Sequence, residues 1–313
     1  MENNSAITVI KLAFEDVKTA NQIYFTWSLM LYVFCVLING FLILIVIFKK
    51  ELHEPMHIFF GNLLFNGIVI STAFLPKLSA DILSNTKFSS VYGCYIQAFC
   101  VHCFILNEVS LLAVMAYDRY LAVCNPLRYM SIMTNAAVFQ FVAVTWLYSV
   151  FLNLIGFILC LRLPLCSSAI NKPYCDYYSI LKLSCVDYSV NNLYATAVSV
   201  LTAVVTLPII TYSYMMIILV CVQKSVGSRW KPLQTCSTHL LAILFYLIGV
   251  LFLAVHSRLS LKDVPQSVYT FLSTEFLIVP PFANPLIYGL GTRAIRTAIK
   301  KLASQSVKKL GYT

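Results

Sequence analysis

The sequence is dominated by long runs of apolar residues that carry almost no charge. Of its 313 residues, 60% are hydrophobic and 11% are charged, whereas soluble domains carry about a quarter charged residues. So little polar surface cannot coat a globule in water, which excludes intrinsic disorder, a disulfide-rich miniprotein and a cytosolic enzyme. The composition therefore indicates a polytopic membrane protein.

Seven runs are long enough to cross a bilayer as helices, which takes about 20 residues each. Transmembrane strands would alternate apolar and polar residues over about ten positions, and the runs lack that pattern. We predict an all-α membrane protein with a seven-helix bundle over residues 24–292, between an extracellular segment 1–23 and a cytoplasmic segment 293–313. The helices are expected at residues 24–48, 56–79, 91–123, 138–161, 189–223, 233–257 and 265–290.

The positive charges predict the orientation of the bundle. Most Lys and Arg residues fall in the short segments that are cytoplasmic if the N-terminus is extracellular, as the positive-inside rule requires. The sequon at Asn3 then lies outside as a glycosylation acceptor. The charges are spread over loops without interleaved aromatic residues, so anionic lipid is their expected partner and nucleic acid is not.

The last 21 residues show helical amphipathicity. Ile295, Ile299 and Leu302 recur on one face, and basic residues occupy the other: Arg293, Arg296, Lys300 and Lys301. A short helix lying in the membrane interface is expected.

Two segments have metal-ligating residue types. His53–His57 fits the H-E-x-x-H pattern of zinc proteases, but Pro55 opens a helix and cannot lie inside one, so the two histidines do not share a helical face. Cys100, His102 and Cys103 lack a fourth ligand and are expected to pack. We therefore expect no metal, cofactor or enzymatic activity.

Four of the eleven cysteines lie at the predicted extracellular end. Cys94 begins the third helix, and Cys166, Cys175 and Cys185 lie in the long loop before the fifth. The oxidising exterior allows them to pair, and the sequence alone leaves the connectivity open.

Two features at the predicted cytoplasmic end indicate a conformational switch. Asp118 and Arg119 place opposite charges at a lipid boundary, which is costly unless they are paired or used. Pro285, within the segment Asn284–Tyr288, removes a helical hydrogen bond and makes the seventh helix bendable at a fixed point.

These residues resemble the rhodopsin-like G-protein-coupled receptors, and within them the odorant receptors. The general receptor features are Asn39, Cys94, Asp118-Arg119-Tyr120, Asn284-Pro285 and Tyr288. The more specific odorant-receptor signatures are Pro55–His57, Met115–Cys124, Ser213-Tyr214, Thr235–Leu240, Phe245-Tyr246 and Pro280-Pro281. Asn66-Gly67 and the segment 289–293 are similar to the fish-like branch of the family.

The resemblance implies roles for these positions. It implies disulfides between Cys94 and Cys175 and between Cys166 and Cys185. It assigns G-protein coupling and switching to Asp118, Arg119, Tyr120, Tyr214, Asn284, Pro285 and Tyr288. Gly67 stands where related receptors carry the Asp of a sodium pocket, which leaves Glu108 and Asn39 as the candidate ion site.

The resemblance also implies a ligand cleft between the third, fifth, sixth and seventh helices. Its expected residues are Val101, His102, Ile105, Leu106, Val198, Thr202, Tyr246, Gly249, Val250, Leu253, Thr274 and Leu277. His102, His256 and Arg258 favour an anionic or amphoteric ligand, whereas Asp176 and Glu275 near the mouth allow the opposite preference.

The expected function is that of an odorant receptor in the plasma membrane of olfactory sensory neuron cilia. A small odorant, a stimulatory heterotrimeric G protein of the cAMP pathway, membrane lipids and a trafficking chaperone are the expected partners. Two alternatives stay open: a rhodopsin-like receptor for a peptide, lipid or metabolite, and a membrane transporter. The sequence shows no internal repeat of the kind transporters have.

Overall fold

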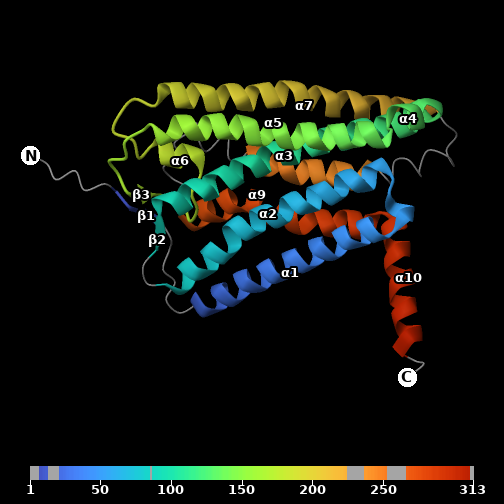
Figure 1. The fold of residues 1–313 in the computed structure, drawn as a ribbon, viewed down its shortest axis with the longest axis horizontal. Coiled ribbons are helices and arrows are strands. Elements are labelled where there is room, and N and C mark those ends of the chain that lie inside the picture. The colour runs from blue at the N-terminus through green and yellow to red at the C-terminus, as the bar shows by residue number, and fades with distance from the viewer. Residues whose placement is uncertain (1–6, 13–20, 85–86, 224–235, 252–265, 311–313) are drawn as a thin grey trace, which may run out of the picture.

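A computed structural model describes residues 7–12, 21–84, 87–223, 236–251 and 266–310 of the chain. It is a bundle of long helices that lie side by side, with one further helix across the end of the bundle (Figure 1). Among the described residues, five helices are long and apolar enough to span a membrane: α1 (Asn21–Phe48), α2 (Pro55–Leu83), α3 (Val91–Cys124), α5 (Asn135–Leu161) and α7 (Ser189–Gln223). The helix Cys236–Leu251 and α9 (Gln266–Gly291) complete the bundle. The predicted seven-helix bundle is confirmed.

Polar residues cap the first turns of two helices, and one of these helices begins earlier than predicted. Thr134 precedes α5, and its hydroxyl accepts a hydrogen bond from the Ala137 amide at 3.2 Å, so the helix begins three residues before the apolar run. Ser90 caps α3 in the same way through the Gly93 amide at 3.1 Å. Such caps satisfy backbone N–H groups that the first turn leaves free.

The predicted amphipathic tail forms helix α10 (Arg293–Leu310). Ile295 and Ala298 are buried against the bundle, and Ile299 and Leu302 pack partly against the same core. The Lys301 ammonium lies 3.0 Å from the Glu51 carboxylate, next to the short helix η1 (Lys50–Leu52). The apolar face therefore contacts protein, while the basic face stays exposed.

Short elements close the two ends of the bundle. At the end that carries α10 lies α4 (Pro126–Ile132), and at the opposite end lies α6 (Tyr177–Leu181) with a three-stranded sheet (Figure 1). Strand β1 (Val9–Leu12) is the middle strand, antiparallel to β2 (Phe88–Ser90) and parallel to β3 (Ala169–Ile170). None of these short elements was predicted from the sequence.

Candidate functional site

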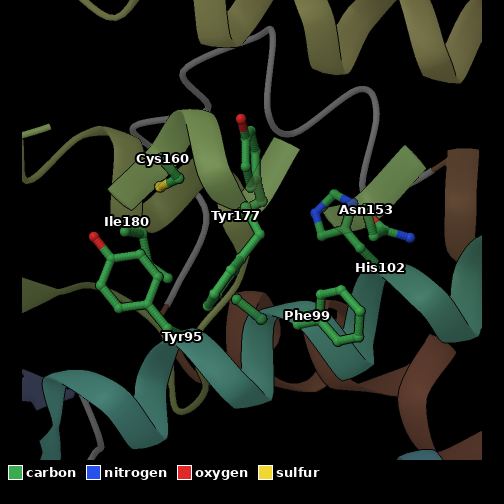
Figure 2. A pocket seen from close by; sticks show the side chains of 9 residues that line it. Tyr95, Phe99, His102, Asn153, Cys160, Tyr177 and Ile180 are labelled. Carbon is green, nitrogen blue, oxygen red and sulfur yellow. The ribbon is translucent and has the colours of Figure 1, made fainter. Parts of the chain in front are cut away.

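A narrow hollow lies between α3, α5 and α6 at the end of the bundle that carries the sheet. Figure 2 shows aromatic rings around it, together with an imidazole, an amide and a thiol. Its lining residues are Tyr95, Ala98, Phe99, His102, Asn153, Phe157, Cys160, Tyr177 and Ile180. Its wall is largely apolar and carries few polar groups.

The loop between α5 and α7 brings α6 to this hollow because it is tied to α3. Cys94 is bonded to Cys175, with their Cα atoms 5.2 Å apart. The Cys175 amide also donates to the Gln97 side chain at 2.7 Å, and Gln97 donates in turn to the Ala73 carbonyl at 3.0 Å. A second disulfide joins Cys166 to Cys185 within the loop. These are the two pairings that the resemblance implies.

Tyr177 of α6 forms one wall of the hollow. Its hydroxyl donates to the Gly156 carbonyl of α5 at 3.1 Å. A Cβ atom at Gly156 would lie 3.2 Å from the Tyr194 ring and 3.6 Å from the Tyr177 ring. A glycine at this position therefore allows both rings to approach the backbone of α5.

His102 lines the hollow and contacts the loop between α5 and α7. Its ring lies edge-on to Tyr177, with 5.5 Å between the ring centroids. In the same loop Lys172 and Asp176 form an ion pair of 2.9 Å, with side chains only 12% and 6% exposed. Burial would raise the pKa of Asp176, but the Lys172 ammonium, a hydrogen bond with Ser179 and the nearby His102 together outweigh this effect and hold the pKa below its ordinary value of 3.8.

Of the residues expected in the ligand cleft, His102 lines the hollow and several others make contacts between helices. Val101 and Leu277 pack in one buried cluster with Phe276 and Tyr174. The Thr202 hydroxyl lies 2.7 Å from the Tyr148 hydroxyl of α5.

The remaining members of the expected cleft lie nearby in the bundle or beyond the described part of the chain. The Tyr246 hydroxyl donates to the Ile105 carbonyl at 3.0 Å. Leu106, Gly249 and Thr274 are buried, and Val198 and Val250 are partly buried. Leu253, His256, Arg258 and Asn3 lie outside the described residues. The wider cleft stays a prediction.

A buried polar network crosses the middle of the bundle. The Glu108 carboxylate accepts hydrogen bonds from Asn66 of α2 at 2.9 Å and from Asn284 of α9 at 2.8 Å. Asn39, the other candidate ion ligand, donates instead to the carbonyls of Cys35 at 2.7 Å and Pro281 at 3.0 Å. The described residues contain no group of three His, Cys, Asp or Glu side chains that could hold a metal ion.

The backbone contact between α2 and α9 explains Gly67. A Cβ atom at Gly67 would lie 3.2 Å from the Cα atom of Pro281. An aspartate here would press against the backbone of α9, and the neighbouring Asn66 supplies the polar contact to Glu108 instead.

The residues predicted to act as a switch gather at the opposite end of α3. The Tyr129 hydroxyl of α4 donates to the Asp118 carboxylate at 2.8 Å. Arg119 Nε is buried and has no hydrogen-bond partner among the described residues. Tyr120 contacts Tyr212 of α7, with 5.5 Å between the ring centroids.

A ring cluster joins three helices beside these charges. Tyr214 of α7 hydrogen-bonds His239 on the helix Cys236–Leu251, and the His239 and Tyr288 ring centroids lie 6.3 Å apart. In the described part of the chain the Tyr288 hydroxyl has no hydrogen-bond partner, although it is buried. Site prediction missed Tyr129, and it named His239 only as part of the signature segment Thr235–Leu240, without a role of its own.

Comparison with known proteins gives the family. Residues 28–306 match the family model described as olfactory receptor. The chain belongs to the olfactory receptor family. Olfactory receptor 4B13 of Mus musculus is 31% identical over 96% of both chains. Olfactory receptor 52B6 of Homo sapiens is 33% identical over 86% of this chain and 81% of its own. Olfactory receptor 1M1 of Mus musculus is 32% identical over 97% of both.

Membership of the olfactory receptor family makes this chain a multi-pass membrane receptor. Coupling to G proteins is general for the family. The five long apolar helices among the described residues agree with a membrane receptor.

Proposed function

We propose that this olfactory receptor binds a small odorant in the hollow between α3, α5 and α6 and signals to a G protein at the opposite end of the bundle. The observation that carries the proposal is that α3 bears both sites, with His102 on the hollow and Asp118-Arg119 far along the same helix. One helix therefore connects the ligand to the switch.

The ligand is a small molecule because the hollow is narrow and largely apolar. His102 and Asn153 supply its polar contacts among the lining residues. The charged pair next to it, Lys172 and Asp176, is internally neutralised at 2.9 Å. The predicted cleft extends the same site toward the helix Cys236–Leu251 and α9. His256 and Arg258 would then make the site prefer a ligand with an acidic group.

The G protein docks at the end that carries α4. Leu127 is 99% exposed and Met130 is 76% exposed on this short helix, next to the Asp118–Tyr129 contact. Exposed apolar side chains beside a buried charge offer a docking surface for an amphipathic helix. The stimulatory type of G protein, acting through cAMP, is the expected partner.

This end of the receptor faces the cytoplasm in the proposed orientation. The exposed basic face of α10, formed by Arg293, Arg296 and Lys300, suits the anionic inner leaflet. Both disulfides lie at the other end, and disulfides persist in oxidising surroundings. Residues 1–23 are therefore extracellular, and residues 293–313 are cytoplasmic. The plasma membrane of olfactory sensory cilia, reached with a trafficking chaperone, is the proposed location.

Activation is a shift between two arrangements of the helices. An odorant moves this equilibrium only by its differential affinity for them. The Tyr246–Ile105 hydrogen bond holds the helix Cys236–Leu251 to α3, on the side of the hollow that faces the proposed G-protein site. Its loss would let the inner end of that helix move and separate His239 from Tyr214, which would uncover Arg119.

A cAMP reporter assay in cells tests this proposal. Pools of short acids, amines, amino acids and neutral volatiles are applied to cells that express the receptor, Arg119→Ala or the control Arg162→Ala, with surface amounts matched by antibody staining. We expect the receptor and Arg162→Ala to respond to the same pool and Arg119→Ala to stay silent. An equal response from Arg119→Ala would contradict the proposed switch.

A further inference from the structure

The N-terminal strand β1 lies across the end of the bundle that holds the hollow. Its side chains alternate, so that Val9 and Lys11 are exposed while Ile10 and Leu12 are buried. Ile10 is 0% exposed and Leu12 is 2% exposed. A segment outside the helices thus places two side chains in the protein core.

Backbone hydrogen bonds hold β1 between the two outer loops. The Lys11 amide donates to the Ser168 carbonyl at 2.6 Å, and the Leu12 amide donates to the Lys87 carbonyl at 2.9 Å. β2 is itself anchored to α2, because the Lys77 ammonium donates to the Phe88 carbonyl at 2.9 Å. β1 therefore links a strand fixed on α2 to the loop that carries α6.

The buried face of β1 belongs to the same packed cluster as the wall of the hollow. Ile10 and Leu12 share one hydrophobic cluster with the disulfide cysteines Cys94 and Cys175. Five residues of that cluster also line the hollow: Tyr95, Ala98, Cys160, Tyr177 and Ile180. Side chains in such a cluster are close-packed, so a loss of volume at one place is felt at its neighbours.

We propose that β1 is a part of the ligand site, in which Ile10 and Leu12 are positioning residues that hold α6 and Tyr177 against the hollow. By holding α6 in place, the strand keeps the hollow closed and so governs the access of small molecules to it. The assignment of the hollow to an odorant rests on the proposed function, whereas the closure by β1 rests on the contacts above.

The thiol of Cys160 reports on this closure without any ligand. Cys160 lines the hollow and is 1% exposed. The probe is a small, cationic, membrane-impermeant methanethiosulfonate applied to intact cells, with Cys160→Ser giving the background from other thiols. Surface-matched wild type, Ile10→Ala/Leu12→Ala and Val9→Ala are compared, and Val9→Ala truncates the exposed face of the same strand.

We expect Ile10→Ala/Leu12→Ala to be modified at Cys160 at least about tenfold faster than wild type, because removing buried methylenes favours local opening. Val9→Ala and the conservative Ile10→Val should match wild type. An unchanged rate in the double variant, or rapid modification of wild-type Cys160, would overturn the proposal.

Two further variants cover the case in which the double variant fails to reach the surface. Lys11→Pro removes the amide that donates to Ser168 and leaves the buried face intact, so it should also speed modification of Cys160.

Val9 and Ser90 are directly opposite each other on β1 and β2, and both are exposed. The single variant Ile10→Ala should also be modified faster than wild type, and a disulfide between Val9→Cys and Ser90→Cys should form and return its rate to that of wild type. Failure of this pair to crosslink would overturn the strand pairing. None of these readouts needs an odorant or a G protein, so a silent reporter assay leaves this test intact.

Discussion

Asn284 of α9 donates a hydrogen bond to Glu108 of α3, with 2.8 Å between Nδ2 and Oε1. Asn66 of α2 donates to the other carboxylate oxygen at 2.9 Å. One buried acid thereby ties the neighbouring helices α2 and α3 to α9, which lies far along the chain, and its two amide partners satisfy both oxygens.

Removing one partner should weaken the bundle. Asn284→Val leaves one Glu108 oxygen buried without a donor, which costs about 1–3 kcal/mol. We expect a lower melting temperature for the purified receptor in detergent, measured by thermal unfolding. Asn192→Val, at an exposed position of α7, is the matched control and should melt like wild type. Equal melting of the two variants would show that the Asn284 contact contributes nothing.

The contact between Gly67 and Pro281 gives a second stability prediction. Gly67→Ala places a methyl group 3.2 Å from the Pro281 Cα atom, and such overpacking costs about 1–3 kcal/mol. Gly40→Ala is the matched control, because a Cβ atom there would meet nothing within 4 Å, and alanine is the better helix former. Surface staining in cells should fall for Gly67→Ala only. Equal surface amounts would contradict the close approach.

The Tyr129–Asp118 hydrogen bond should restrain basal signalling. Burial raises the pKa of Tyr129 above its ordinary value of 10.0, and the Asp118 carboxylate adds to this effect. The phenol therefore remains a donor at physiological pH. A hydrogen bond to a charged group is worth about 1.5–3 kcal/mol, so Tyr129→Phe should raise basal cAMP about tenfold or more if the active state is rare. Tyr92→Phe, at an 81% exposed position, is the control, and unchanged basal cAMP in Tyr129→Phe would refute the restraint.

Much of the fold follows from the sequence, because lipid requires each spanning segment to satisfy its own backbone as a helix. The short elements do not follow, since β1 gains its hydrogen bonds from residues about 80 and 160 positions away along the chain. His102 was found by its place on α3, but the other wall of the hollow comes from Tyr177, whose loop carries no periodic pattern. Likewise Glu108 was predicted as a candidate ion ligand, while its contact with Asn284 depends on how α3 and α9 pack.

The ion pair in the outer loop predicts a dependence on pH. A carboxyl group whose pKa is lowered on folding stabilises the fold above its unfolded pKa, and this stability is lost as the pH falls through the folded pKa. The Lys172–Asp176 pair should therefore contribute fully at neutral pH and fade below pH 3.8, the ordinary pKa of the group. Asp176→Asn should melt several degrees below wild type at pH 7, since breaking a buried pair costs about 3–5 kcal/mol.

Thermal unfolding at a series of pH values checks this prediction. The gap between Asp176→Asn and wild type should narrow in acid, and the charge-exchanged variant Lys172→Asp/Asp176→Lys should recover part of the lost stability at pH 7. A gap that does not vary with pH would mean that the pair is not the source of the effect.

The most direct test of odorant binding in the hollow is a substitution that fills it. Ala98 is 4% exposed and lines the hollow, whereas Ala197 is exposed on α7, so Ala98→Leu and Ala197→Leu add the same volume at two different places. The measurement is the concentration dependence of odorant-evoked cAMP in cells with matched surface amounts of wild type and both variants. We predict that wild type and Ala197→Leu respond to the same odorant pool at the same concentrations, and that Ala98→Leu loses the response or needs at least about tenfold more odorant. An Ala98→Leu response that coincides with wild type would contradict the claim that odorants bind between α3, α5 and α6.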